Sequence, residues 1–124
     1  MIFFVDRSLG RKHVVEALRA AGQEAIAHDD RFPPDLPDVD SLAEAGRNGW
    51  VVLTKDKRIR TRGLERDALR AAKVRAFIVT TGNLTGAELA ALVARALPNV
   101  VRIAGETAPP FIARITPVDV ALYE

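Results

Sequence analysis

Short apolar runs alternate with amphipathic stretches along most of this chain, and that alternation is the strongest constraint on its fold. The runs are too continuous for half-exposed strands, so they indicate strands that are buried on both faces. Between them, apolar residues repeat at helical spacing, which predicts the helical crossovers that neighbouring parallel strands require. The expected strands are residues 2–5, 25–27, 50–54, 77–79 and 100–103.

This pattern predicts an α/β fold, namely a single-domain three-layer α/β/α sandwich with a mostly parallel central sheet. A chain of 124 residues has the size of one domain, so we expect residues 1–124 to form it together. Residues 105–124 are expected to supply an edge strand, at 110–116, and a tail. A helix that begins at Thr85 is expected to stop at Pro98, and residues 28–37, with three prolines, are expected to form a loop.

The composition excludes several classes of protein. The chain has no cysteine, so disulfides, thiolate zinc sites and cysteine nucleophiles are ruled out. No apolar run approaches the ~20 residues that a membrane span needs. The first apolar run reaches Asp6 without a basic lead and without the length of a signal peptide. We therefore expect a cytoplasmic protein with no membrane partner.

Charge is unevenly distributed, although the net charge is only +2. Residues 55–75 carry nine basic and three acidic side chains, whereas residues 28–40 carry five aspartates and one arginine. A metal-dependent enzyme that acts on a polyanion needs this combination, because the acids hold cations while the bases attract phosphates. The alternative is a solvated surface on which the arginines pair with Glu65 and Asp67.

Three aspartates are expected to meet at the carboxyl edge of the sheet, where ligands of open α/β sheets bind. Asp6 and Asp56 follow predicted strands, and Asp38 opens the helix that leads into the strand at 50–54. Neighbouring carboxylates repel one another, and a hard divalent ion such as Mg²⁺ or Mn²⁺ relieves that repulsion. Each aspartate alone could serve only as a helix cap or turn former. Together they predict a metal site.

The segments around these aspartates resemble PIN domains. The start, Phe4-Val5-Asp6-Arg7-Ser8, is similar to the opening Asp-x-Ser of that family. Residues 38–56 resemble its succession of an acid that opens a helix, a strand, and Thr-x-Asp. The compact layout is most similar to the PIN-like toxins of the VapC kind, and the resemblance covers about the first two thirds of the chain.

The resemblance implies that Asp6, Asp38 and Asp56 are the catalytic, metal-binding acids. PIN nucleases usually carry another acid, a Glu on a helix that precedes the position of Asp38. This chain has the proline-rich acidic segment there instead. Three aspartates are candidates to replace that Glu: Asp40, Asp29 and Asp30.

The function implied by the resemblance is that of a metal-dependent endoribonuclease, the toxin of a toxin–antitoxin pair, which hydrolyses RNA with Mg²⁺ or Mn²⁺. Ser8 and Thr54 would orient the metal-binding carboxylates. The partners would be RNA and a cognate antitoxin protein, with a homodimer left open. The RNA backbone would lie on a set of basic side chains, which are Lys55, Lys57, Arg58, Arg60 and Arg62.

Two other classes stay open at this stage. One is a catalytically silent PIN-like binding module, which only a cleavage assay separates from the enzyme. The other is a receiver-like phosphoacceptor domain, which has a similar length and also places acids after its first and third strands. That class expects paired acids after the first strand and a lysine after the fifth. This chain offers only Asp6 at the first position and no lysine beyond Lys73.

Overall fold

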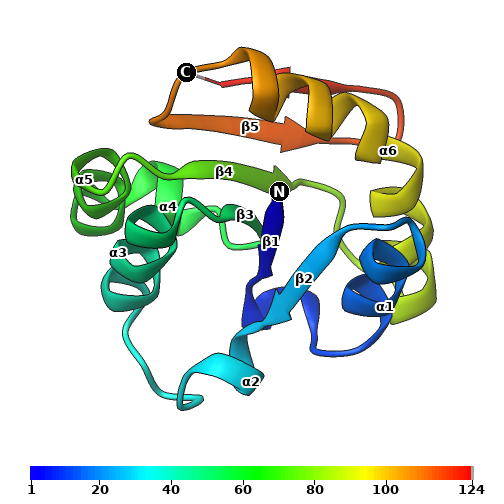
Figure 1. Cartoon of the computed structure of the whole chain (residues 1–124), viewed down its shortest axis with the longest axis horizontal. Helices are drawn as coiled ribbons and strands as arrows, with labels where there is room; N and C mark the ends of the chain where they lie inside the picture. Colours follow the sequence, from blue (N-terminus) through cyan, green and yellow to red (C-terminus); the bar gives the residue numbers. More distant parts are fainter. Residues whose placement is uncertain (124) are drawn as a thin grey trace.

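A computed structural model describes residues 1–123, which are organised around one six-stranded sheet (Figure 1). The strand order is β2-β1-β3-β4-β5-β6, and the neighbouring pairs from β2 to β5 are all parallel. Strand β6 runs antiparallel to β5. The bounds are β1 (Ile2–Val5), β2 (Glu24–Ala27), β3 (Val51–Thr54), β4 (Arg75–Val79), β5 (Phe111–Ile115) and β6 (Val120–Leu122).

Helices cover both faces of the sheet, which confirms the α/β class and the three layers (Figure 1). Helices α1 (His13–Ala20) and α6 (Gly86–Glu106) pack on one face. Helices α3 (Asp38–Asn48), α4 (Arg58–Thr61) and α5 (Gly63–Ala71) pack on the other.

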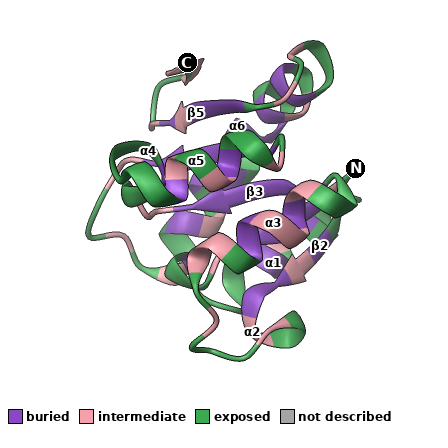
Figure 2. Ribbon diagram, turned by 90° about the vertical axis from the view of Figure 1, so that its left-hand side faces the viewer, coloured by how far each residue is buried: buried purple, intermediate pink, exposed green. Residues whose placement is uncertain are grey.

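Side chains alternate between these two layers along each strand. In β1, Phe3 and Val5 join the core beneath α1 and α6, whereas Phe4 joins the core beneath α3 and α5. Figure 2 shows the result, with buried strands inside and exposed residues on the outer sides of the helices. Because both faces are covered, a strand of this sheet needs apolar residues at successive positions, and this explains the continuous apolar runs of the sequence.

The prediction of a strand at residues 100–103 is wrong, because this segment is the continuation of α6. The capping box of Thr85 and Glu88 is present as expected, but Pro98 lies inside the helix and does not end it. Buried residues keep the helical spacing across the proline, from Leu97 to Val100 and Ile103. Burial of this apolar stripe against the sheet outweighs the backbone hydrogen bond that proline removes.

The edge strand predicted at residues 110–116 is also placed wrongly. Strand β5 lies inside the sheet, between β4 and β6, and its residues are mostly buried. Since residues 100–103 are helical, the next apolar run takes the place of the fifth strand. The edge is β6, a three-residue strand that the prediction included only as part of a tail.

The acidic segment after β2 begins with a short helix, α2 (His28–Arg31), so the loop predicted for 28–37 starts too early. All three prolines of the segment come after Arg31 and therefore leave that turn free to form. A short 3₁₀ helix, η1 (Arg7–Leu9), follows β1 in the corresponding way. In residues 1–123 no helix has both the length and the apolar character that crossing a membrane requires.

Helix α3 lies so close to the end of α5 that one position between them tolerates no side chain. A Cβ atom at Gly46 would fall on the backbone carbonyl and Cβ of Ala72. We expect Gly46→Ala to lower the free energy of unfolding by roughly 1–3 kcal/mol, because backbone must move to make room. Urea unfolding measures this change.

The matched control is Gly105→Ala, at a glycine that also lies within a helix but whose Cβ would meet open space. Alanine favours the helix there, so a gain of up to about 1 kcal/mol is expected. An equal response of the two glycines would contradict the close packing of α3 against α5.

Candidate active site

The three aspartates predicted to converge line one small cavity at the carboxyl edge of the sheet. Asp6 directly follows β1, Asp56 lies just beyond β3, and Asp38 is the first residue of α3. The cavity measures about 10 Å³, which is the room that one water molecule takes. Its other walls come from the strands and helices around it, namely Phe4, Ser41, Leu42, Val52, Thr54 and Ile59.

Asp6 is held by hydroxyl groups from two segments that are distant in sequence. Its Oδ2 accepts hydrogen bonds from the Ser8 backbone N–H (3.1 Å), the Ser8 hydroxyl (2.6 Å) and the Thr54 hydroxyl (2.9 Å). The two hydroxyls accept in turn from the backbone N–H groups of Lys55 and Asp56, each at 2.9 Å. All three hydrogen bonds are accepted by Oδ2 of Asp6. They fix the orientation of the carboxylate, and none of them involves Oδ1.

Arg58 forms a fork on the carboxylate of Asp56. Its Nε lies 2.9 Å from Oδ1 and 3.0 Å from Oδ2, and its Nη2 lies 2.7 Å from Oδ2. The Arg58 backbone N–H donates to Oδ1 as well, at 2.9 Å. The same Nη2 is 3.8 Å from Asp38 Oδ2. The guanidinium therefore spans two of the three carboxylates that line the cavity.

The pKa values of the carboxyl groups follow from these contacts. Hydrogen bonds from the Arg58 side chain hold the pKa of Asp56 below its ordinary value, although burial acts in the opposite direction. Burial, followed by the charges of Asp6 and Asp56, raises the pKa of Asp38. Arg58 and Arg7 offset this rise only in part. The arginine thus stabilises one anion strongly and leaves its neighbour short of positive charge.

Within residues 1–123, no group of three or more His, Cys, Asp or Glu side chains is placed so that it could hold a metal ion as it stands. The three aspartates share a cavity, but Asp56 directs both of its oxygens to Arg58. The carboxylate oxygens nevertheless suit a hard divalent ion, and the water-sized cavity between them suits one small cation.

The sequence candidates for a fourth acid are not among the residues that line this cavity. Asp40 and Asp30 are exposed, and Asp29 contacts His28 Nδ1 at 3.1 Å and Arg11 at 4.0 Å. Sequence reasoning treated Glu65 only as an ion-pair partner, yet its side chain is buried on α5 and its Oε2 accepts no hydrogen bond. The charge of Glu65 also acts on Arg58.

One pattern in the sequence could have drawn attention to Glu65. It lies four residues before the buried Leu69, and therefore on the inner side of α5.

The basic side chains beside the site have different environments. Lys57, Arg58, Arg60 and Arg62 are exposed, and Lys55 is half-buried. The Arg60 guanidinium lies 4.1 Å from the centre of the Tyr123 ring, and Arg62 lies 4.0 Å from Glu65. The alternative in which these arginines pair with acids of α5 therefore applies to Arg62, whereas Arg58 is turned towards the aspartates.

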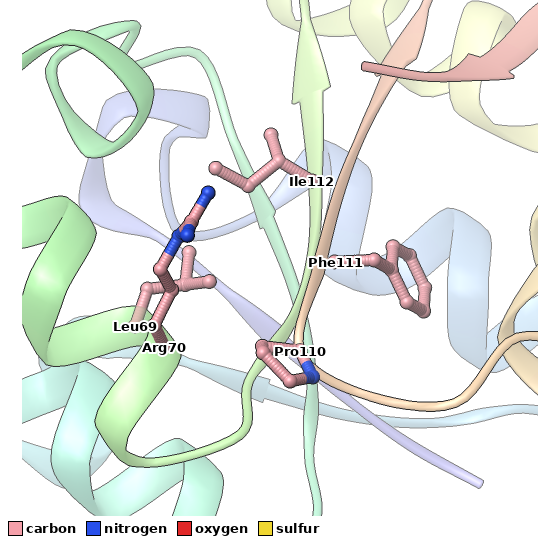
Figure 3. A pocket seen from close by; sticks show the side chains of 5 residues that line it. All are labelled: Leu69, Arg70, Pro110, Phe111 and Ile112. Atoms are coloured by element: carbon pink, nitrogen blue, oxygen red, sulfur yellow. The ribbon is translucent and has the colours of Figure 1, made fainter. Parts of the chain in front are cut away.

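A roomier cavity, of about 370 Å³, lies between α5 and the start of β5. Figure 3 shows Ile112 and Phe111 on opposite sides of β5, with Leu69 and Arg70 facing the Ile112 side. Its lining includes no carboxylate or hydroxyl side chain: Leu69, Arg70, Pro110, Phe111 and Ile112. The larger of these two cavities therefore lacks the acidic side chains that make the smaller one the candidate site.

The unequal charge compensation predicts an effect of pH on stability. The pKa of Asp38 is raised in the folded protein, so at pH values above it the ionised carboxylate lowers the free energy of unfolding. That cost vanishes below the ordinary value of about 4, where the group is protonated in both states. We expect Asp38→Asn to raise the melting temperature at neutral pH in EDTA, and the gain to shrink as the pH falls towards 4.

Asp40→Asn is the matched control, because Asp40 lies in the same first turn of α3 but is exposed. Both substitutions remove one negative charge from the helix N-terminus, so their difference isolates the repulsion inside the cavity. Equal melting temperatures of the two variants at neutral pH would rule that repulsion out.

Comparisons with known proteins identify the family of the chain. Residues 1–81, about two thirds of the chain, match the family described as "PIN like domain". A protein of Mycobacterium tuberculosis (strain ATCC 25618 / H37Rv) named "Putative ribonuclease VapC45" is 29% identical over 118 residues, which cover 92% of this chain and 85% of the relative. A search of solved structures returned no significant match. The resemblance carried by the aspartate motifs is thus confirmed: the chain belongs to the PIN-like domain family.

Proposed function

We propose that this protein is a metal-dependent endoribonuclease that acts as the toxin of a toxin–antitoxin pair. The observation that carries the proposal is the meeting of Asp6, Asp38 and Asp56 around one water-sized cavity, beside the basic helix α4. Membership of the PIN-like family and the similarity to a protein named as a VapC ribonuclease support the same reading.

In this proposal Asp6, Asp38 and Asp56 hold Mg²⁺ or Mn²⁺, with Asp40 outside the set because it is exposed. The ion would supply activation of a water molecule and stabilisation of the charge that develops on the scissile phosphate. Ser8 and Thr54 keep the Asp6 carboxylate in place by their bonds to Oδ2. Asp38, whose charge Arg58 and Arg7 compensate only in part, would gain from a bound cation.

RNA would lie across the basic segment that follows β3. Lys55, Lys57, Arg60 and Arg62 offer cations on one short stretch next to the cavity, and such side chains bind phosphates without reading the sequence. Arg58 belongs to this group only when its guanidinium leaves Asp56.

The proposal extends to the rest of the chain and to its partner. Residues 82–124 lie beyond the family match, but β5 pairs with β4, so we assign them to the same nuclease unit. A nuclease that cleaves cellular RNA works in the cytoplasm and needs restraint, which a cognate antitoxin protein would provide.

A catalytically silent PIN-like module is the second candidate. It is favoured by one observation, the fork of Arg58 on Asp56, which satisfies that carboxylate with a cation of the chain itself. The cleavage assay below separates the two candidates.

We expect Asp6→Asn, Asp38→Asn and Asp56→Asn each to reduce Mn²⁺-dependent cleavage of RNA by roughly a hundredfold or more, because each removes an anionic ligand while keeping the shape of the side chain. Initial rates on a labelled RNA, with circular dichroism to show that each variant is folded, measure this loss. The control is Glu44→Gln, a substitution that removes a charge from α3 at a residue paired with Arg47.

Two results would contradict the proposal. Absence of cleavage by the folded wild-type protein with Mg²⁺ or Mn²⁺ would favour the silent module. Full activity of any one aspartate variant would remove that residue from the site. Growth arrest on expression of the wild type, relieved by co-expression of a cognate antitoxin, is expected for a toxin and should not occur with Asp6→Asn.

A separate prediction concerns the RNA-binding surface. Replacement of Lys57, Arg60 and Arg62 by Ala should weaken RNA binding about equally for different sequences. It should also flatten the dependence of log K on log salt by up to ~0.7 per lost contact with single strands. Filter binding in EDTA at several salt concentrations measures the slope. An unchanged slope in the triple variant would place the RNA elsewhere.

A further inference from the structure

We propose that Arg58 is an internal counter-cation that competes with the divalent ion for Asp56 and Asp38, and that metal binding releases its guanidinium to the RNA backbone. This inference rests on the proposed function, because it names a regulation of the same site.

The contacts of Arg58 cover the oxygens that a metal ion would need. Its side chain contacts both oxygens of Asp56 at 2.7–3.0 Å, and its Nη2 is 3.8 Å from Asp38 Oδ2. The Arg47–Glu44 pair on α3 has similar short contacts, at 2.9–3.0 Å, but involves one carboxylate at the surface. The two arginines differ in location, because Arg58 contacts two of the three acids that line the cavity.

A divalent ion and the guanidinium cannot both occupy this position. A cation bound by Asp56 would use the lone pairs that now accept hydrogen bonds from Arg58, and the two positive charges would repel each other. The guanidinium is also free to leave, since the Arg58 side chain is 53% exposed, against 14% for Asp56 and 24% for Asp38.

The released side chain has a use next to the site. Arg58 begins α4, the turn that also carries Arg60, with Lys57 just before it and Arg62 just after it. The planar fork that now fits a carboxylate fits a phosphate equally well. Metal binding would therefore add one arginine to the RNA-binding surface. By reciprocity, bound RNA would strengthen metal binding by the same factor.

The test compares Mn²⁺ binding and RNA kinetics in Arg58→Gln and wild-type protein. We expect calorimetric titration with Mn²⁺ alone, without RNA, to give about fivefold tighter binding in Arg58→Gln, because a partly exposed bidentate ion pair no longer competes. The KM for RNA should rise in the same variant, because a phosphate contact is lost. Opposite changes in metal and RNA affinity are not expected from a residue that only supports the fold.

Two further variants complete the design. Arg47→Gln removes the two contacts that Arg47 makes with one oxygen of Glu44 and should change neither quantity. Arg58→Lys keeps the charge but loses the fork, and its affinity for Mn²⁺ should lie between those of the wild type and Arg58→Gln. It also serves as the second variant if Arg58→Gln does not fold.

The outcomes separate this inference from the proposed function. Equal Mn²⁺ affinity in the wild type and both Arg58 variants, with metal-dependent cleavage intact, would overturn the role of Arg58 alone. Failure of all of these proteins to bind Mn²⁺ would overturn both the metal site and the competition for it. An unchanged KM in Arg58→Gln would overturn the release of Arg58 to RNA.

Discussion

The pairing of β1 with β3 is the interaction on which the candidate site depends. Phe3, Phe4 and Val5 lie beside Val51, Val52 and Leu53 in parallel register, and the Asp6 N–H extends the ladder to Leu53 O at 2.9 Å. Because the two strands run in the same direction, their following residues come together at one edge. A register shift by one residue would move each side chain of β1 into the opposite core layer, so the packing of both layers fixes the register and with it the site.

The sequence allowed prediction of those strands and helices that can be recognised from the spacing of apolar residues within the segment itself. Residues 2–5 of β1 and 51–53 of β3 are all apolar because helices cover both faces, and that feature is visible without the structure. Residues 100–103 have the same β-branched composition, yet they are helical. Their apolar stripe continues that of α6 across Pro98, and only contact with the sheet decides between the two conformations.

The same distinction applies to the site. The convergence of Asp6, Asp38 and Asp56 was expected because the carboxyl ends of parallel strands share one edge of the sheet. The fork of Arg58 was not expected, since its partner is two residues away in a turn whose shape no periodicity reveals. Glu65 was missed for a related reason: its burial depends on how α5 packs on the sheet.

An aromatic cluster beneath the cavity strengthens the electrostatic interactions of the three carboxylates. Phe4, which lines the cavity, stacks on Trp50 with 5.6 Å between ring centroids and contacts the buried His28 and Phe32 at 5.9 and 5.7 Å. These rings form an apolar wall on one side of the carboxylates, where water cannot solvate them. Positive charge therefore compensates these acids more effectively than water can. Burial of Asp38 and its repulsion from Asp6 and Asp56 cost stability in the free protein.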